Sequence, residues 1–140
     1  MTRIALLSAF LLMNVVALAQ YHTPEQHCSD FFGKLPAGSQ EAFQSLFNSN
    51  PNFVDFNRDR YEDMQKSVGE QTKHLGELFS HELLKKEKQG ESLIRLTYLA
   101  KYQRGPAVVY FTWYTGREDW QIIDFKIDSR GYAIQQLFAK

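Results

Sequence analysis

Cysteine is almost absent from this 140-residue sequence, because Cys28 is the only one. A single thiol cannot form a disulfide within the chain, so a hydrophobic core has to hold the fold together. Charge of one sign is not in excess either, since 16 basic and 16 acidic residues give a formal net charge of +0. A mixed, near-neutral surface lacks the basic footprint of proteins that bind nucleic acids or anionic membranes. We therefore expect no nucleic-acid partner.

Recognisable catalytic and metal-binding motifs are also missing. The sequence has no glycine-rich phosphate loop and no Gly-x-Ser-x-Gly turn. None of the four histidines has an i,i+4 or His-x-His partner, which is the spacing of metal pairs; these residues are His22, His27, His74 and His81. We interpret them as surface or hydrogen-bonded histidines, and we predict no metal site and no cofactor.

The first 19 residues have the composition of a secretory signal peptide. Arg3 precedes a largely apolar run from Ile4 to Leu18, and Ala17-Leu18-Ala19 has the small-x-small pattern of a signal-peptidase site. The run is shorter than the ~20 apolar residues that a membrane helix needs. We therefore predict cleavage after Ala19, export to the periplasm or beyond the cell, and no stable membrane anchor; an uncleaved tether is the alternative.

The predicted mature region, 20–140, reads as one domain that begins with helices. Thr23, Pro24 and Gln26 have the cap, first-turn proline and N3 residue of a helix over 24–34. A short helix is expected from Ser39, and "NSNPN" at 48–52 is expected to be a turn. A longer helix over 58–75 carries an apolar stripe on one side and charges on the other: Tyr61, Met64, Val68, Thr72 and Leu75 make the stripe. Cys28 lies on one helical face with Phe31, Phe32 and Leu35, which indicates a buried thiol rather than a nucleophile.

Four strands are expected from Glu77 onward, over 77–88, 91–103, 107–115 and 119–128. In the second, alternate residues are apolar, with Leu99 as the exception on the polar face; the alternating set is Ile94, Leu96, Tyr98, Ala100 and Tyr102. Gly116-Arg117 suits a two-residue hairpin turn, and a second such turn at Gly105-Pro106 would put Tyr98 and Tyr102 on the face of Phe111. Helices followed by an antiparallel meander predict an α+β fold.

The stretches "SLIRLTYLAKYQRGPAVVYFTWY" at 92–114 and "DWQIIDFKID" at 119–128 resemble small exported bacterial members of the nuclear-transport-factor-two-like, or cystatin-like, superfamily. The resemblance covers 24–128 in outline and is specific over 92–128. It implies N-terminal helices packed on a curved four-stranded antiparallel sheet, in a cone-like arrangement. It implies little about activity, because this fold carries enzymes, binding modules and transport factors.

The resemblance also implies a place for a catalytic group, because enzymes of this fold bury an acid, histidine or tyrosine in the cone. Asp124 is the candidate. A two-residue turn at Gly116-Arg117 would put Trp113 opposite Trp120 and Phe111 opposite Ile122, with Asp124 on the same face. That face would form the ligand pocket, made by Tyr98, Tyr102, Phe111, Trp113, Trp120 and Ile122. There Asp124 is a base with a raised pKa, or else it lies near water or pairs with a Lys or Arg.

The function expected from the sequence is that of an exported, non-enzymatic module that binds a small apolar ligand or an envelope protein. The alternative is a small hydro-lyase or isomerase that uses Asp124 as its single carboxylate. The face opposite Asp124 would carry another apolar set: Val108, Tyr110, Ile123, Phe125 and Ile127. Strands 107–115 and 119–128 are therefore apolar on both faces, and helices can cover only one of them. The tail "YAIQQLFAK" at 132–140, or a second copy in a homodimer, is expected to cover much of the other.

Overall fold

The computed structural model describes residues 22–117 and 119–140, so the predicted signal peptide lies outside the described residues. Four helices come first: α1 (Pro24–Lys34), α2 (Ser39–Phe47), α3 (Pro51–Phe56) and α4 (Arg58–Thr72). Four strands follow, β1 (Leu78–Gln89), β2 (Leu93–Tyr102), β3 (Gly105–Thr115) and β4 (Trp120–Asp128), and α5 (Gly131–Gln136) ends the chain. The predicted α+β class is confirmed.

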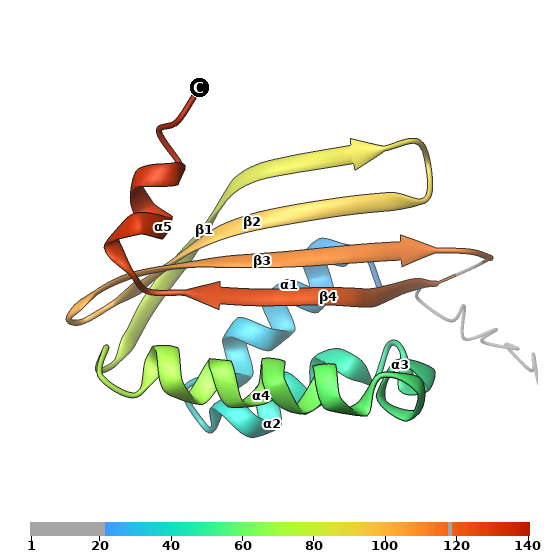
Figure 1. The fold of residues 1–140 in the computed structure, drawn as a ribbon, viewed down its shortest axis with the longest axis horizontal. Coiled ribbons are helices and arrows are strands. Elements are labelled where there is room, and N and C mark those ends of the chain that lie inside the picture. Colours follow the sequence, from blue (N-terminus) through green and yellow to red (C-terminus); the bar gives the residue numbers. More distant parts are fainter. Residues whose placement is uncertain (1–21, 118) are drawn as a thin grey trace, which may run out of the picture.

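The sheet is an open antiparallel meander in the order β1-β2-β3-β4. Figure 1 shows α1 to α4 on one side of it, which we call the inner face, while α5 lies at the other end of the molecule from α3. Two register shifts interrupt β1, between Leu78 and Ser80 and between Leu83 and Lys85. Such bulges bend a strand, and β1 swings across the end of the sheet in Figure 1.

Local sequence signals explain the helices. The Thr23 hydroxyl caps α1 by accepting from Gln26 N, and the Gln26 side chain accepts from Thr23 N, which completes the predicted capping box. The predicted turn at 48–52 is wrong in part, because Asn50 caps a short helix that begins at Pro51. Proline at the first helical position needs no hydrogen bond from its nitrogen, so the same residues that suggest a turn also start a helix.

The core lies between the helices and the inner face. Phe31 of α1 contacts Phe111 and Phe125, with ring centroids 5.5 and 5.4 Å apart, and Phe43 of α2 contacts Phe125 at 5.6 Å. The predicted stripe of β2 is buried here, and so are Met64 and Val68 of α4. Aromatic pairs at these distances stabilise the fold by more than the burial of their apolar area alone. This core determines which side chains remain available on the opposite, outer face.

Both predicted hairpin registers need correction. The β2–β3 turn is Gln103-Arg104, because Tyr102 pairs with Gly105, and the β3–β4 loop covers residues 116–119, because Thr115 pairs with Trp120. The two-residue turn at Gly116-Arg117 is therefore wrong. Trp113 pairs with Ile122 rather than Trp120, and Phe111 pairs with Phe125 rather than Ile122.

A bulge in β4 has a larger consequence than either turn. The register shifts between Thr112 and Trp113, so Ile123 is an extra residue between the partners Ile122 and Asp124. One inserted residue reverses which face every later side chain occupies. Phe125 and Ile127, predicted on the outer face, are buried in the core, and Asp124 pairs with Thr112 on the outer face.

Candidate functional site

The residues predicted to line a ligand pocket are packed into the core. Five are buried, and Trp120 is half-buried against the same cluster; the five are Tyr98, Tyr102, Phe111, Trp113 and Ile122. The structure brings the six together on the inner face, as predicted. Helix α1 fills the space above them, since Phe32 stacks against His81 at 4.2 Å and tilts against Tyr98 at 5.3 Å.

Burial changes the chemistry of the polar groups in this cluster. It raises the pKa of Tyr102 to about 12, and it raises the pKa of Tyr98 further, with a smaller contribution from the neighbouring Cys28. It also raises the pKa of the Cys28 thiol well above its usual range. The Tyr102 hydroxyl and the Trp113 indole nitrogen have no hydrogen-bond partner among the described residues. These groups are neutral and have the character of core residues.

Asp124 is not among the aromatic side chains. Its carboxylate accepts a hydrogen bond of 2.7 Å from the guanidinium of Arg60 in α4, and the two side chains are 43% and 54% exposed. This ion pair matches the alternative interpretation of Asp124, in which its carboxylate pairs with a Lys or Arg. The β4 bulge explains it, because the extra residue moves Asp124 off the inner face and leaves it at the free edge of the sheet.

A groove on the outer face has a volume of about 630 Å³. Its floor comes from β1, β2 and β3 and its wall from the C-terminal tail; the apolar lining is Leu84, Leu99, Pro106, Tyr110, Ile134, Leu137, Phe138 and Ala139. The polar lining is Glu82, Lys85, Glu87, Thr97 and Gln136. Ligand pockets for small molecules have volumes of about 300–1,000 Å³ and a mostly apolar lining.

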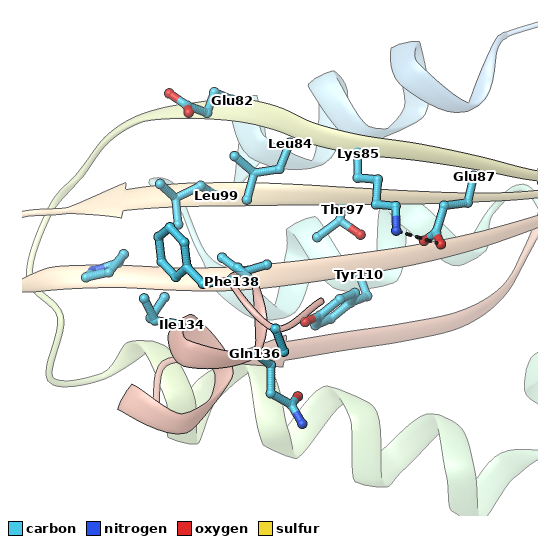
Figure 2. Close-up of a pocket in the computed structure, with 13 residues that line it drawn as sticks. Glu82, Leu84, Lys85, Glu87, Thr97, Leu99, Tyr110, Ile134, Gln136 and Phe138 are labelled. Atoms are coloured by element: carbon cyan, nitrogen blue, oxygen red, sulfur yellow. Dashed lines mark ion pairs between the residues drawn. The ribbon is translucent and has the colours of Figure 1, made fainter.

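Figure 2 shows the polarity of this groove. Leu99, Ile134 and Phe138 gather at one end, and the ion pair between Lys85 and Glu87, with 3.1 Å between Nζ and Oε1, lies at the other. Phe138 is 83% exposed and Leu84 is 40% exposed. Large apolar side chains left this open usually mark a contact site.

The ion pair of Asp128 with Arg130 holds the tail that forms the groove wall. The Asp128 carboxylate is 3% exposed and accepts from Arg130 N, Nε and Nη2 at 3.0, 2.9 and 2.6 Å. These hydrogen bonds lower the pKa of Asp128 below its usual value, against the opposing effect of burial. The bonds fix the direction in which the chain leaves β4, so α5 turns onto the outer face.

The sequence contained a weak signal for this groove. Leu99 was an apolar residue on the polar face of its strand, and it now lies in the groove beside the tail. Leu84 could not have been placed, because the β1 bulge between Leu83 and Lys85 determines its direction. The tail covers part of the second face, where the tail or a second copy was expected to cover much of it: Ala133 is buried, and Ile134 and Leu137 line the groove.

Within 22–117 and 119–140, no group of three or more His, Cys, Asp or Glu side chains could hold a metal ion. None of the helices in the same ranges has the length and hydropathy needed to cross a membrane. In the comparisons with known proteins, the chain matched no family model, no curated protein and no solved structure.

Proposed function

We propose that this protein is an exported, non-enzymatic binding module that holds a small apolar ligand in the outer-face groove. The observation that carries the proposal is the groove itself: about 630 Å³ of hollow, lined mainly by apolar side chains, two of which are exposed, Leu84 and Phe138. An apolar ligand that covers Leu84 and Phe138 removes them from water and is stabilised by their burial. The ion pair of Lys85 and Glu87 at the polar end suits a ligand with one polar terminus.

The arrangement of helices on one face of a four-stranded meander supports a place in the nuclear-transport-factor-two-like superfamily, as a small exported member. In this proposal the ligand binds on the outer face rather than in the inner-face pocket that the resemblance implies. The space that the superfamily resemblance assigned to a pocket is occupied here by Phe31 and Phe32 of α1. The tail after β4 supplies a second wall on the opposite face instead.

The hydro-lyase or isomerase alternative has less support. Catalysis by one buried carboxylate requires a site from which water is excluded, but Asp124 is half-exposed and paired with Arg60. We expect Asp124→Asn to change the free energy of unfolding by less than about 1 kcal/mol, as is usual for exposed ion pairs. Ligand binding in the groove is expected to be unchanged.

The test uses the apolar dye anilinonaphthalene sulfonate and two matched leucine variants. Leu84 is 40% exposed and lines the groove, whereas Leu93 is 38% exposed on the neighbouring strand and does not line it. We expect Leu84→Ser to weaken dye binding about fivefold, because covering the exposed part of a leucine contributes about 1 kcal/mol. Leu93→Ser is the control and should leave the dissociation constant unchanged.

Equal weakening by both variants would show that the dye binds exposed apolar surface in general, and would overturn the groove as the site. Native mass spectrometry of protein isolated from its own envelope fraction provides the second measurement. A bound small molecule supports the proposal. A stoichiometric protein partner in its place contradicts the choice of a small ligand, and loss of binding in Asp124→Asn favours the carboxylate alternative.

A further inference from the structure

Four side chains that can donate hydrogen bonds cross the outer face in one row, at the polar end of the groove. The members are successive cross-strand partners: Lys85, Thr97, Tyr110 and Lys126. Directly paired side chains on neighbouring strands lie about 5 Å apart. The first three line the groove, and Lys126 continues the row on β4. The row therefore places an ammonium and two hydroxyls beside the apolar lining.

Thr97 is a nearly buried polar residue whose remaining surface faces the groove. It is 4% exposed, and it is one of the residues that line the groove. Its hydroxyl makes no hydrogen bond with another described residue. Figure 2 shows this hydroxyl on the side of the Lys85 ammonium, its partner in the strand register. A buried hydroxyl without a partner is unfavourable, so a ligand oxygen at this point is stabilised by accepting from it.

Lys85 can exchange its present partner for a ligand at little cost. Its ion pair with Glu87, at 3.1 Å, joins side chains that are 66% and 39% exposed. Such exposed pairs contribute little to stability. Glu87 is also the cross-strand partner of Arg95, which forms no ion pair with a described residue. The Glu87 carboxylate therefore keeps a cation beside it when Lys85 turns to a ligand.

The other carboxylates near the groove are neutralised by partners of their own. Glu82 lines the groove and pairs with Lys101, and Asp124, farther across the outer face, pairs with Arg60. Lys126 is exposed and forms no ion pair with a described residue. The polar end of the groove thus has an excess of positive charge, which favours an anionic ligand over a cationic one.

We infer that the ligand of the outer-face groove is an alkyl monocarboxylate. Its carboxylate lies at Lys85 and Thr97, and its alkyl chain lies along Leu84, Leu99 and Phe138. The inference rests on the proposed function and adds the chemical class of the ligand. Hydrogen bonds from an ammonium and a hydroxyl to a carboxylate are strengthened by its charge. The alkyl chain removes the exposed apolar side chains from water.

The experiment titrates the protein by calorimetry with three probes of equal alkyl length, decanoate, decanol and decylammonium, each below the concentration at which it forms micelles. We expect decanoate to bind about tenfold more tightly than decanol, because the two hydrogen bonds to its head are charge-assisted. Decylammonium should bind most weakly. Added salt should weaken the binding of decanoate and leave that of decanol unchanged, since the ammonium is exposed to solvent.

Three variants test the head of the ligand separately from its chain. Thr97→Val keeps the shape of the side chain and should weaken decanoate binding about tenfold, because it removes a hydrogen bond to a charged group. Lys85→Glu should reverse the preference, so that decylammonium binds more tightly than decanoate. Lys88→Glu is the matched control, because it makes the same charge change in β1 at an exposed residue that does not line the groove. It should leave the preference unchanged.

The outcomes distinguish this inference from the proposed function. Equal affinities for the three probes, all weakened by Leu84→Ser, would overturn the carboxylate and leave the groove as a site for apolar ligands. If Leu84→Ser weakens none of the probes, the groove is not the site, and the inference fails together with the proposed function. Preference of the wild type for decylammonium, or equal effects of Lys85→Glu and Lys88→Glu, would also contradict the inference.

Discussion

The protonation of a buried side chain in this protein depends on which groups surround it. Cys28 and Asp128 are both almost fully buried, but Cys28 is among apolar side chains whereas Asp128 accepts three hydrogen bonds from Arg130. Burial is the main cause that raises the pKa of the Cys28 thiol, and the nearby charge of Glu25 adds to it. Hydrogen bonding lowers the pKa of the carboxyl in spite of burial. Cys28 is therefore unreactive, whereas Asp128 stays charged and anchors the tail.

The Asp128 anchor predicts a dependence of stability on acid. Because the pKa of Asp128 is lowered from 3.8 in the folded state, its contribution is complete above pH 3.8 and is lost as pH falls through the lower folded value. We expect Asp128→Asn to be less stable than the wild type at neutral pH, with the difference closing below that pH. Urea unfolding at several pH values measures it. Asp59→Asn, on the exposed face of α4, is the control. If Asp128→Asn stays less stable than the wild type in acid, the Asp128 carboxylate is not the group responsible.

Cys28 is expected to be reduced and slow to react. Its side chain has no exposed surface, and reaction needs the thiolate, which burial disfavours. The measurement compares the rate of labelling by an aromatic disulfide reagent in buffer and in denaturant. Labelling of the folded protein as fast as the denatured protein would show that the thiol is accessible.

At the scale of elements, the bulge in β4 is supported from outside the sheet. Ser49 and Asn50, between α2 and α3, hydrogen-bond the two backbone groups of Ile122: Ile122 N donates to Ser49 Oγ at 3.2 Å, and Asn50 Nδ2 donates to Ile122 O at 2.9 Å. An edge strand otherwise leaves such groups unpaired. The Asn50 side chain also accepts from Phe53 N at 3.2 Å and so caps α3. One residue therefore connects a helix start to the strand edge.

We expect Asn50→Ala to lower the free energy of unfolding by about 1–3 kcal/mol, because it leaves the buried Ile122 carbonyl and the α3 cap without a partner. Denaturant unfolding followed by circular dichroism measures the loss. Asn48→Ala provides the matched control, since Asn48 is exposed in the same loop and its side chain makes no hydrogen bond with a described residue. Equal stability of the two variants would show that the contact is unimportant.

For the whole molecule, α5 covers only part of the outer face. Leu93 and Tyr114 form a cross-strand pair at the end of the sheet away from the groove, and they are 38% and 40% exposed. Exposed apolar surface on one sheet face favours a second copy. This supports the prediction of a homodimer through the sheet face, with the groove left open.

Sedimentation equilibrium at micromolar concentration is expected to give the mass of a dimer. A charged substitution, Leu93→Lys, should shift the equilibrium toward monomer, because burying an unpaired ammonium in an apolar contact is unfavourable. Leu84→Lys, at the groove, is the comparison variant and should leave the dimer intact. A wild-type monomer at high micromolar concentration would remove the prediction.

The sequence alone determined what depends on near neighbours. The helix over 24–34 with its capping box, the start of α2 at Ser39, the four strands and the buried stripe of β2 follow from caps, turn residues and periodicity, and all are present. Even the face shared by Tyr98 and Phe111 was correct although the turn was misplaced. The error moved the register by an even number of residues, which keeps every side chain on its own face.

Only the tertiary structure decided where Asp124 lies and where a ligand can bind. The bulge at Ile123 is held by Ser49 and Asn50, more than 70 positions earlier, and no local pattern in β4 announces it. The groove likewise needs a bulge in β1, an unusual leucine in β2 and a tail held by Asp128 to meet on one face. Side chains alternate along a strand with a period of two, so a single inserted residue reverses the face, and whether it is inserted depends on partners distant in the chain.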